Sequence, residues 1–220
     1  TKGPPMKLAT FNINGIKARI DALPAWLASA NPDVVCLQEI KSVDDAFPRE
    51  VFESMGYRVE THGQKSFNGV AILSKLPIED ITRGLPGDDT DEQARWIEAT
   101  VIGSRAVRVC GLYLPNGNPT PGPKYDYKLA WMARMETRVR ALLATEEPCV
   151  FCGDYNVIPQ DADAAKPELW TSDALALPQS RAAYRRLLAL GLTDAFRARN
   201  PAPGQYTFWD YQAGAWERNN

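Results

Sequence analysis

One stretch predicts a buried strand that ends in polar residues, and the expected fold is built around it: Pro148-Cys149-Val150-Phe151-Cys152-Gly153-Asp154-Tyr155-Asn156. An apolar run bounded by turn residues is typical of a strand that is buried on both faces. Because side chains alternate along a strand, we expect Asp154 and Asn156 to project from the same side where this strand ends. A carboxylate and an amide held side by side can position a water and stabilise a developing oxyanion. The same residues also suit an ordinary turn that closes a strand.

Three other apolar stretches follow the same pattern and carry polar residues at or near their ends. They deliver Asn12 after residues 6–11, Glu39 after residues 33–38, and Tyr113 within residues 107–114. The carboxyl ends of strands are where ligands bind in open α/β sheets, so we expect these side chains to meet. Their oxygen donors favour Mg²⁺ or Mn²⁺ over zinc. A phosphate of the substrate would complete the coordination, which suits in-line hydrolysis of a phosphodiester.

Length and composition suit a single domain. The chain has 220 residues, 45% of them hydrophobic, and no compositional break marks a linker. We expect residues 6–220 to form one domain and residues 1–5 to be the remnant of an expression tag. The formal net charge of −2 excludes a globally basic protein, so any nucleic-acid surface must be local. No apolar run approaches the roughly 20 residues that a membrane helix needs.

The cysteines indicate a reducing compartment. All four lie far apart or inside apolar runs, and no signal peptide is recognisable. Cys149 and Cys152 form a C-x-x-C pair. Residues three apart on a strand face opposite sides, so we expect no disulfide between them.

Hydrophobic periodicity predicts alternating strands and helices. Further strands are expected at 57–61, 69–73, 96–102 and 205–211, and helices at 20–31, 48–55, 124–145 and 180–190. Because several strands come in hairpin-like pairs, we expect an α/β fold of α+β character, with a mixed-sheet core and helices outside.

Several motifs, in this order, resemble the endonuclease/exonuclease/phosphatase superfamily. They are Asn12, Leu37-Gln38-Glu39, Tyr113-Leu114-Pro115-Asn116 and Gly153-Asp154-Tyr155-Asn156. Within it, the chain resembles the exonuclease III branch of abasic-site endonucleases at 62–65, 68–72, 83–87, 124–129 and 207–211. The resemblance implies a four-layer sandwich of two packed mixed β-sheets flanked by helices. It also implies Mg²⁺-dependent hydrolysis of DNA in base excision repair, by abasic-site incision, 3′–5′ exonuclease action and 3′-phosphatase action.

The resemblance assigns catalytic roles residue by residue. Glu39 matches the metal ligand, and Asn12 matches the residue that orients water and metal beside it. Asp154 matches the residue that activates or positions the attacking water, and Asn156 the transition-state stabiliser. The residues expected at the metal ion are Glu39, Asn12, Asp154 and Asn156. Tyr113 matches the phenol that contacts the scissile phosphate.

The resemblance also assigns DNA-binding residues. Phe208 matches an aromatic wall against the base-free sugar, with Trp209 beside it, although both also suit a core. Lys65, Arg95 and Asn116 match backbone-phosphate contacts, which would set register and salt dependence without reading sequence. Lys65 and Arg95 equally suit solvated surface positions.

Other residues have plainer interpretations. Glu39 also suits a solvated strand end, and Tyr113 a core aromatic with a satisfied hydroxyl. His62 is the only histidine, but it lies in a loop that the family does not use for its base, so we expect it to be non-catalytic. The acidic run 88–92 is most simply a solvated loop.

The sequence departs from the family pattern after Asn220. The resemblance implies a later Arg-x-Asp strand and a Ser-Asp-His segment, which supply a histidine, its orienting aspartate and a further metal-side aspartate. We therefore expect a domain truncated at its C-terminus, with its last strands missing, and near inactivity for a polypeptide of these 220 residues. A tail outside the sequence or a cut protein explains this better than a degenerate relative, because every upstream residue is intact.

The expected partner is double-stranded DNA with abasic sites, nicks or 3′ ends. We expect the protein to act as a monomer and to have no membrane partner. The expected setting is the bacterial cytoplasm, in association with the nucleoid. One alternative is a catalytically inactive module that binds abasic or nicked DNA. Another is a superfamily phosphodiesterase that acts on RNA, inositol phosphates or sphingomyelin.

Overall fold

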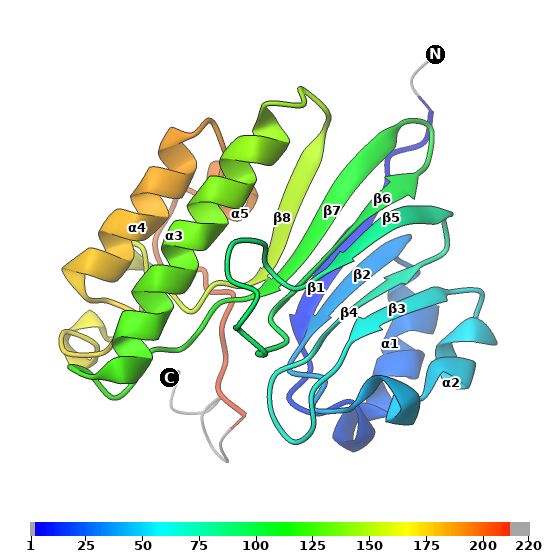
Figure 1. Cartoon of the computed structure of the whole chain (residues 1–220), viewed down its shortest axis with the longest axis horizontal. Helices are drawn as coiled ribbons and strands as arrows, with labels where there is room; N and C mark the ends of the chain where they lie inside the picture. Colours follow the sequence, from blue (N-terminus) through cyan, green and yellow to red (C-terminus); the bar gives the residue numbers. More distant parts are fainter. Residues whose placement is uncertain (1–2, 212–220) are drawn as a thin grey trace. The chain divides into compact units, whose positions relative to one another are not determined.

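The computed structural model describes residues 3–211 (Figure 1). Its contacts divide the chain into two compact units. The first comprises Thr1–Leu114 and Ala141–Tyr155, and the second comprises Pro115–Arg140 and Asn156–Asn220. The single-domain organisation stays a prediction.

The first unit contains a four-stranded mixed sheet of order β1-β2-β4-β3. Its strands are β1 (Leu8–Asn12), β2 (Val34–Gln38), β3 (Arg58–His62) and β4 (Val70–Ser74). β1 runs parallel to β2, and the other pairs are antiparallel. All four strands were expected from the sequence, and their ends differ by no more than two residues.

A second four-stranded mixed sheet of order β5-β6-β7-β8 belongs to the same unit. Its strands are β5 (Ile78–Arg83), β6 (Trp96–Ile102), β7 (Ala106–Tyr113) and β8 (Cys149–Asp154). β7 and β8 are parallel, and the other pairs are antiparallel. The sequence pattern missed β5, because a bulge between Glu79 and Thr82 interrupts the alternation that marks a strand.

β8 is less buried than expected. Among the strands of residues 3–211, it lies at the end of its sheet and pairs with β7. The Val150 side chain on this strand is 36% exposed. The expectation of a strand buried on both faces is therefore wrong, because only Cys152 of its six residues is buried.

The two sheets pack face to face through apolar side chains. Val34, Cys36 and Ile72 of the first sheet share a core cluster with Ile97 and Val109 of the second. The opposite face of the first sheet packs against α1 (Ala22–Ala30) and α2 (Arg49–Glu53), which contribute Leu23, Leu27 and Phe52. Both faces of β2 are thus covered, which explains its continuous apolar run. The expected fold class, two packed mixed sheets flanked by helices, is confirmed.

All four cysteines are free thiols, so the expectation for the C-x-x-C pair is confirmed. A hydrogen bond with Cys152, followed by burial, raises the pKa of the Cys36 thiol well above its ordinary value. This thiol therefore stays protonated and behaves as a small core residue.

The second unit contains α3 (Pro123–Leu143, whose last three residues count with the first unit), α4 (Pro178–Ala189) and α5 (Ala195–Arg199). Short 3-10 turns occupy Asp161–Asp163 and Pro167–Leu169. The strand expected at 205–211 is wrong: these residues have no regular secondary structure. A strand needs a neighbour to satisfy its backbone groups, and the described part of this unit contains no other strand.

Within residues 3–211, no helix combines the length and the apolarity needed to span a membrane.

Candidate active site

The predicted polar strand ends meet in the first unit. Asn12 ends β1, and Glu39 directly follows its parallel neighbour β2. Tyr113 and Asp154 end the parallel strands β7 and β8 and are register partners. Parallel strands end at the same edge of a sheet, so each pair presents its last side chains together.

The Asn12 amide joins the two sheets at this point. Its Nδ2 donates to Glu39 Oε2 at 2.7 Å and to Asp154 Oδ2 at 2.9 Å. Its Oδ1 accepts a hydrogen bond from the Asn14 N–H at 3.0 Å. The acceptor bond fixes which end of the amide faces the carboxylates. Asn12 therefore holds two carboxylates at one nitrogen.

The charge at this cluster favours a cation. Two carboxylates that share one amide repel each other unless positive charge lies nearby. Lys41 Nζ lies 3.8 Å from Glu39 Oε1 and donates to Asn14 Oδ1 at 2.6 Å. The Glu39 side chain is 23% exposed, so it does not lie in a dry interior. Carboxylate oxygens that are accessible to water are the ligands that Mg²⁺ and Mn²⁺ prefer, so Glu39 and Asp154 fit such an ion.

The backbone of Glu39 is strained. Its φ of 51° lies in the left-handed region, which costs a side-chain-bearing residue about 1 kcal/mol or more. The flanking chain is held in place: Gly15 N–H donates to Glu39 O at 2.8 Å, and Ile40 N–H donates to Gly69 O at 3.1 Å. Strain maintained in this way is common at functional sites.

The Tyr113 phenol belongs to the same cluster. Burial raises its pKa above the ordinary value, and the Glu39 carboxylate, which is also its hydrogen-bond partner, raises it further. The Arg95 guanidinium opposes this rise and lies 4.7 Å from the centre of the ring. Arg95 Nη1 also donates to Tyr113 O at 3.2 Å. The phenol is therefore protonated at neutral pH and can donate a hydrogen bond.

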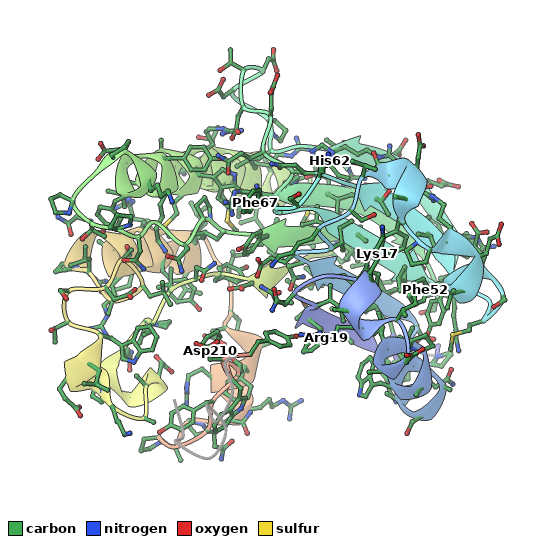
Figure 2. The ribbon with its side chains drawn as sticks, turned by 90° about the horizontal axis from the view of Figure 1, so that it is seen from below. Lys17, Arg19, Phe52, His62, Phe67 and Asp210 are labelled. Atoms are coloured by element: carbon green, nitrogen blue, oxygen red, sulfur yellow. The ribbon has the colours of Figure 1, made fainter. Side chains whose placement is uncertain are left out.

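Lys65 and His62 lie elsewhere in the first unit. Lys65 is exposed in the loop between β3 and β4, which also carries Phe67 (Figure 2). His62 ends β3, whereas Asn12 ends β1 at the other edge of the same sheet. Burial lowers the pKa of His62, Asp44 opposes this and Arg83 adds to it. The non-catalytic role of His62 stays a prediction.

Asn116 and Asn156 belong to the second unit. β8 ends at Asp154, and Asn156 has a left-handed φ of 44°. The premise that strand alternation carries Asp154 and Asn156 to one side is therefore wrong, because the extended chain stops before Asn156. Instead, Lys128 Nζ donates to Asn116 O at 3.1 Å and to Asn156 O at 2.5 Å.

Phe208 and Trp209 lie in the irregular segment after α5. The Phe208 side chain is 54% exposed, which excludes the core interpretation for this residue. The Trp209 ring is half-buried and lies edge-on to Tyr206, with ring centres 6.2 Å apart. An exposed aromatic side chain is available to stack on a ligand.

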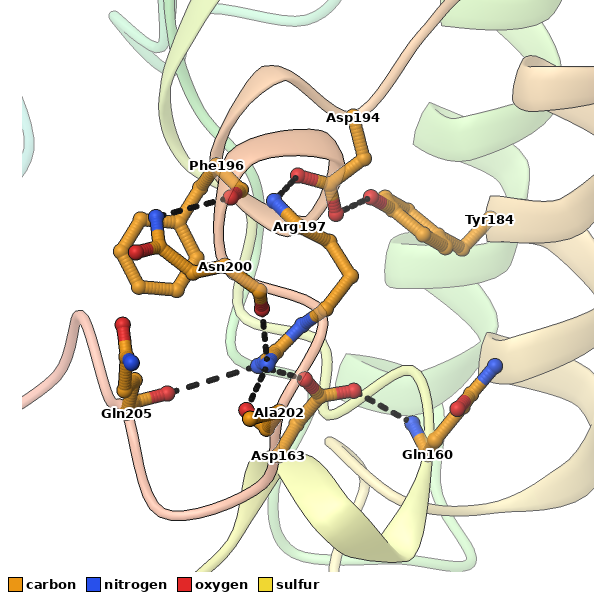
Figure 3. Close-up of polar contacts among 9 residues, drawn as sticks. All are labelled: Gln160, Asp163, Tyr184, Asp194, Phe196, Arg197, Asn200, Ala202 and Gln205. Atoms are coloured by element: carbon orange, nitrogen blue, oxygen red, sulfur yellow. Dashed lines mark hydrogen bonds and ion pairs between the residues drawn. The ribbon is translucent and has the colours of Figure 1, made fainter.

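Arg197 anchors the segment that leads to these aromatics (Figure 3). Its Nη1 donates to Asn200 O at 2.9 Å and to Ala202 O at 3.0 Å. Its Nη2 donates to Asp163 Oδ1 at 2.5 Å and to Gln205 O at 3.4 Å. One guanidinium thus fixes three carbonyl groups that no strand or helix satisfies.

Sequence reasoning missed Asn14, Lys41, Lys128 and Arg197. The Asn12-Ile13-Asn14-Gly15 turn carried a signal, since Asn and Gly favour left-handed turns, and Asn14 has a φ of 44°. Lys41 and Arg197 carried none, because lysine and arginine are most often solvated. Lys128 lies in the 124–129 motif, but the motif gave this residue no role.

Described residues 3–211 contain no cluster of three or more histidine, cysteine, aspartate or glutamate side chains suited to a metal ion. The carboxylate donors at Asn12 are Glu39 and Asp154. A cation there would need water or substrate oxygens to complete its coordination, which is the usual arrangement for Mg²⁺.

Comparison with known proteins gives consistent likenesses. The sequence profile of the Endonuclease/Exonuclease/phosphatase family matches residues 9–220. Exodeoxyribonuclease III of Haemophilus influenzae is 37% identical over 225 residues, covering 97% of this chain and 84% of that protein.

Solved structures agree with this likeness. An AP endonuclease from Archaeoglobus fulgidus superposes with a TM-score of 0.91 at 36% identity, covering 98% of this chain and 82% of that one. A variant of the 3′ phosphatase NExo from Neisseria, bound to a product DNA hairpin, superposes with a TM-score of 0.92 at 37% identity, covering 97% and 82%.

Proposed function

The chain belongs to the endonuclease/exonuclease/phosphatase family, and on that premise we propose that it hydrolyses phosphodiester bonds of DNA as a repair nuclease of the exodeoxyribonuclease III type. The observation that carries the proposal is the Asn12 amide, which holds the Glu39 and Asp154 carboxylates together beside the Tyr113 phenol. This set of groups suits the attack of water on phosphorus and offers no Ser or Cys nucleophile.

The substrates we propose are abasic sites and 3′ ends in double-stranded DNA. The related proteins are named as an exodeoxyribonuclease, an AP endonuclease and a 3′ phosphatase. These three reactions share one step, displacement at a phosphate by water, so one set of residues can serve them all. We also propose that the protein acts as a monomer in the bacterial cytoplasm, in association with the nucleoid.

We further propose that Glu39 and Asp154 hold Mg²⁺, or Mn²⁺ in its place. When bound, such an ion polarises a phosphate oxygen and neutralises charge that develops in the transition state. Asn12 keeps both carboxylates oriented by donating to each of them. Asp154 accepts a proton from the attacking water or positions that water, and Tyr113 donates its hydroxyl hydrogen to a phosphate oxygen.

We also propose substrate contacts for residues of the second unit. The Asn156 amide donates to the oxygen on which negative charge develops. Asn116 contacts a backbone phosphate, as do Lys65 and Arg95 of the first unit. Exposed Phe208, with Trp209, forms an apolar wall for the sugar that lacks a base. Phosphate contacts fix the register of the protein on DNA and make binding sensitive to salt.

The test of this proposal is incision of a duplex that carries one synthetic abasic site, with the full-length protein and Mg²⁺. Asp154→Ala should lower the incision rate at least about 1,000-fold, because water would lose its positioning carboxylate. EDTA should abolish incision. The control is Asp89→Ala, in the exposed acidic loop 88–92, which should cleave at the wild-type rate. Wild-type cleavage by Asp154→Ala or in EDTA would overturn the proposal, and binding without cleavage by the wild type would favour a DNA-binding module.

A further inference from the structure

Lys128 of α3 is a fully buried lysine, with an exposed fraction of 0%. Its ammonium donates to the backbone oxygens of Asn116, at 3.1 Å, and Asn156, at 2.5 Å. We propose that Lys128 is a positioning residue for the reaction, which holds the two loops that carry these asparagines in one fixed arrangement. The inference rests on the proposed function, since that function gives Asn116 and Asn156 their roles.

The position of Lys128 is costly, which argues for a specific use. It lies on the buried side of α3, one or two turns from Trp131, Met132 and Met135, which are all nearly fully buried. Removing an ammonium group from water costs several kcal/mol unless hydrogen bonds compensate. A leucine or methionine would fill the same space without that cost. The feature that such a residue lacks is the donor group at the tip, which meets the two carbonyls.

The loop after Asn116 is built around the lysine stem. Gly117 has a φ of 89°, and a Cβ added to it would lie 2.6 Å from Lys128 Cδ and 3.2 Å from Ala174 Cβ. Only a glycine allows the backbone to cross so close to the side chain at this φ. The lysine therefore contacts this loop twice, along its stem and at its tip.

The side chain of Asn116 is also oriented. Its Oδ1 accepts hydrogen bonds from Asn118 N, at 3.1 Å, and Asn118 Nδ2, at 2.8 Å. Asn118 is held in turn by Asp173 and by the Ala174 N–H, which donates to Asn118 Oδ1 at 3.0 Å. With its oxygen engaged in this way, Asn116 presents its NH₂ group as the donor for a phosphate.

Lys128 also holds the backbone of Asn156. Its φ of 44° is a conformation that few residues other than glycine adopt, although asparagine tolerates it best. The hydrogen bond from Lys128 fixes the carbonyl of this residue and thereby the direction of its side chain. Because a misplacement of about 1 Å in a catalytic group can cost about 100-fold in rate, loss of this bond should affect catalysis.

The test is Lys128→Met in the full-length protein, assayed on an abasic duplex with Mg²⁺ well below its melting temperature. Methionine keeps most of the stem and removes the ammonium. We expect kcat to fall about 10–100-fold while KM changes less than about 3-fold, since Asn116 is one of several proposed phosphate contacts and Lys65 and Arg95 stay in place. The matched control is Arg49→Met, which removes another cationic donor to a backbone carbonyl, Val59 O at 2.6 Å, in the first unit. This control should lose stability but keep the wild-type kcat.

A double-mutant cycle separates positioning from mere stabilisation. Asn156→Ala alone should lower kcat strongly, and adding Lys128→Met should lower it by less than about 2-fold more. If Lys128→Met does not fold, Lys128→Arg enters the same cycle, because its planar fork cannot reproduce the ammonium geometry. An unchanged kcat, losses that multiply, or an equal kcat loss in Arg49→Met would overturn the inference. Failure of the wild type to cleave would instead refute the proposed function.

Discussion

Two regions of the molecule hold polar side chains in place by different means. In the first unit, Asn12, Tyr113 and Asp154 are the last residues of strands, and Glu39 directly follows one. Sheet register determines where they lie, and one amide joins the carboxylates. In the second unit, Asn116 and Asn156 lie in loops, and a buried ammonium fixes their backbones.

Strand ends and loops need different amounts of support to hold a polar side chain. Many backbone hydrogen bonds fix the position of a strand end, so a change at one side chain leaves the backbone where it is. A loop has no such ladder and needs a dedicated donor for its free carbonyls. Removing a sheet-held group should therefore cost the chemistry of that group, whereas removing a loop anchor should move groups that remain present.

Asn12→Ala should give the largest effect of the variants that probe this comparison. It leaves two carboxylates without their shared donor, so their mutual repulsion rises and one oxygen of each loses its partner. We expect kcat to fall about 100–1,000-fold and the Mg²⁺ concentration for half-maximal rate to rise. Rates measured over a Mg²⁺ titration test this. The control is Asn200→Ala, which removes the hydrogen bond that Asn200 Nδ2 donates to Phe196 O. A rate near that of the wild type at all Mg²⁺ concentrations would mean that the strands alone hold the carboxylates.

Tyr113→Phe should have the next largest effect and adds a pH signature. The variant loses the phenolic donor but keeps the ring against Arg95, so kcat should fall about 10–100-fold with little change in KM. Because burial and Glu39 raise the pKa of the phenol, the donor is retained below that raised value and is lost as pH rises through it.

The wild-type kcat should therefore show no decline at the ordinary tyrosine pKa of about 10. A pH–kcat profile of wild type and Tyr113→Phe measures this. A decline centred near pH 10 in the wild type, absent in the variant, would contradict the burial of the phenol in a carboxylate environment.

The sheet-held part of the site was predictable from the sequence, and the reason is physical. Strong apolar runs end where a strand ends, so Asn12, Glu39, Tyr113 and Asp154 could be placed without knowing any contact. The bridging role of Asn12 could not be predicted from the sequence, because it depends on the packing of one sheet on the other.

The loop-held part was not predictable in the same way. Alternation suggested a common side for Asp154 and Asn156, but the left-handed backbone of Asn156 breaks the pattern. Lys128 resembles any surface lysine in an amphipathic helix, and only its contacts identify it as buried. Strand β5 was missed for a similar reason, because its bulge interrupts the alternation of side chains that predicts a strand.

Arg197→Met should give the smallest effect and tests the loop side of the comparison. Asn200, Ala202 and Gln205 would lose the donor that holds their carbonyls, and Asp163 would lose its ion pair. The segment that carries Phe208 would then sample more conformations, and binding would have to order it again. We expect KM for abasic duplex to rise about 3–10-fold with kcat within about 2-fold of wild type.

The matched control for this variant is Arg199→Met, an exposed arginine on the same short helix α5. It removes the same charge, so it separates loss of the anchor from loss of attraction for DNA, and its KM should stay within about 2-fold of wild type. Equal KM values for the two variants would mean that charge alone acts here. A fall in kcat without a rise in KM would mean that the segment held by Arg197 acts in the chemical step and not in DNA binding.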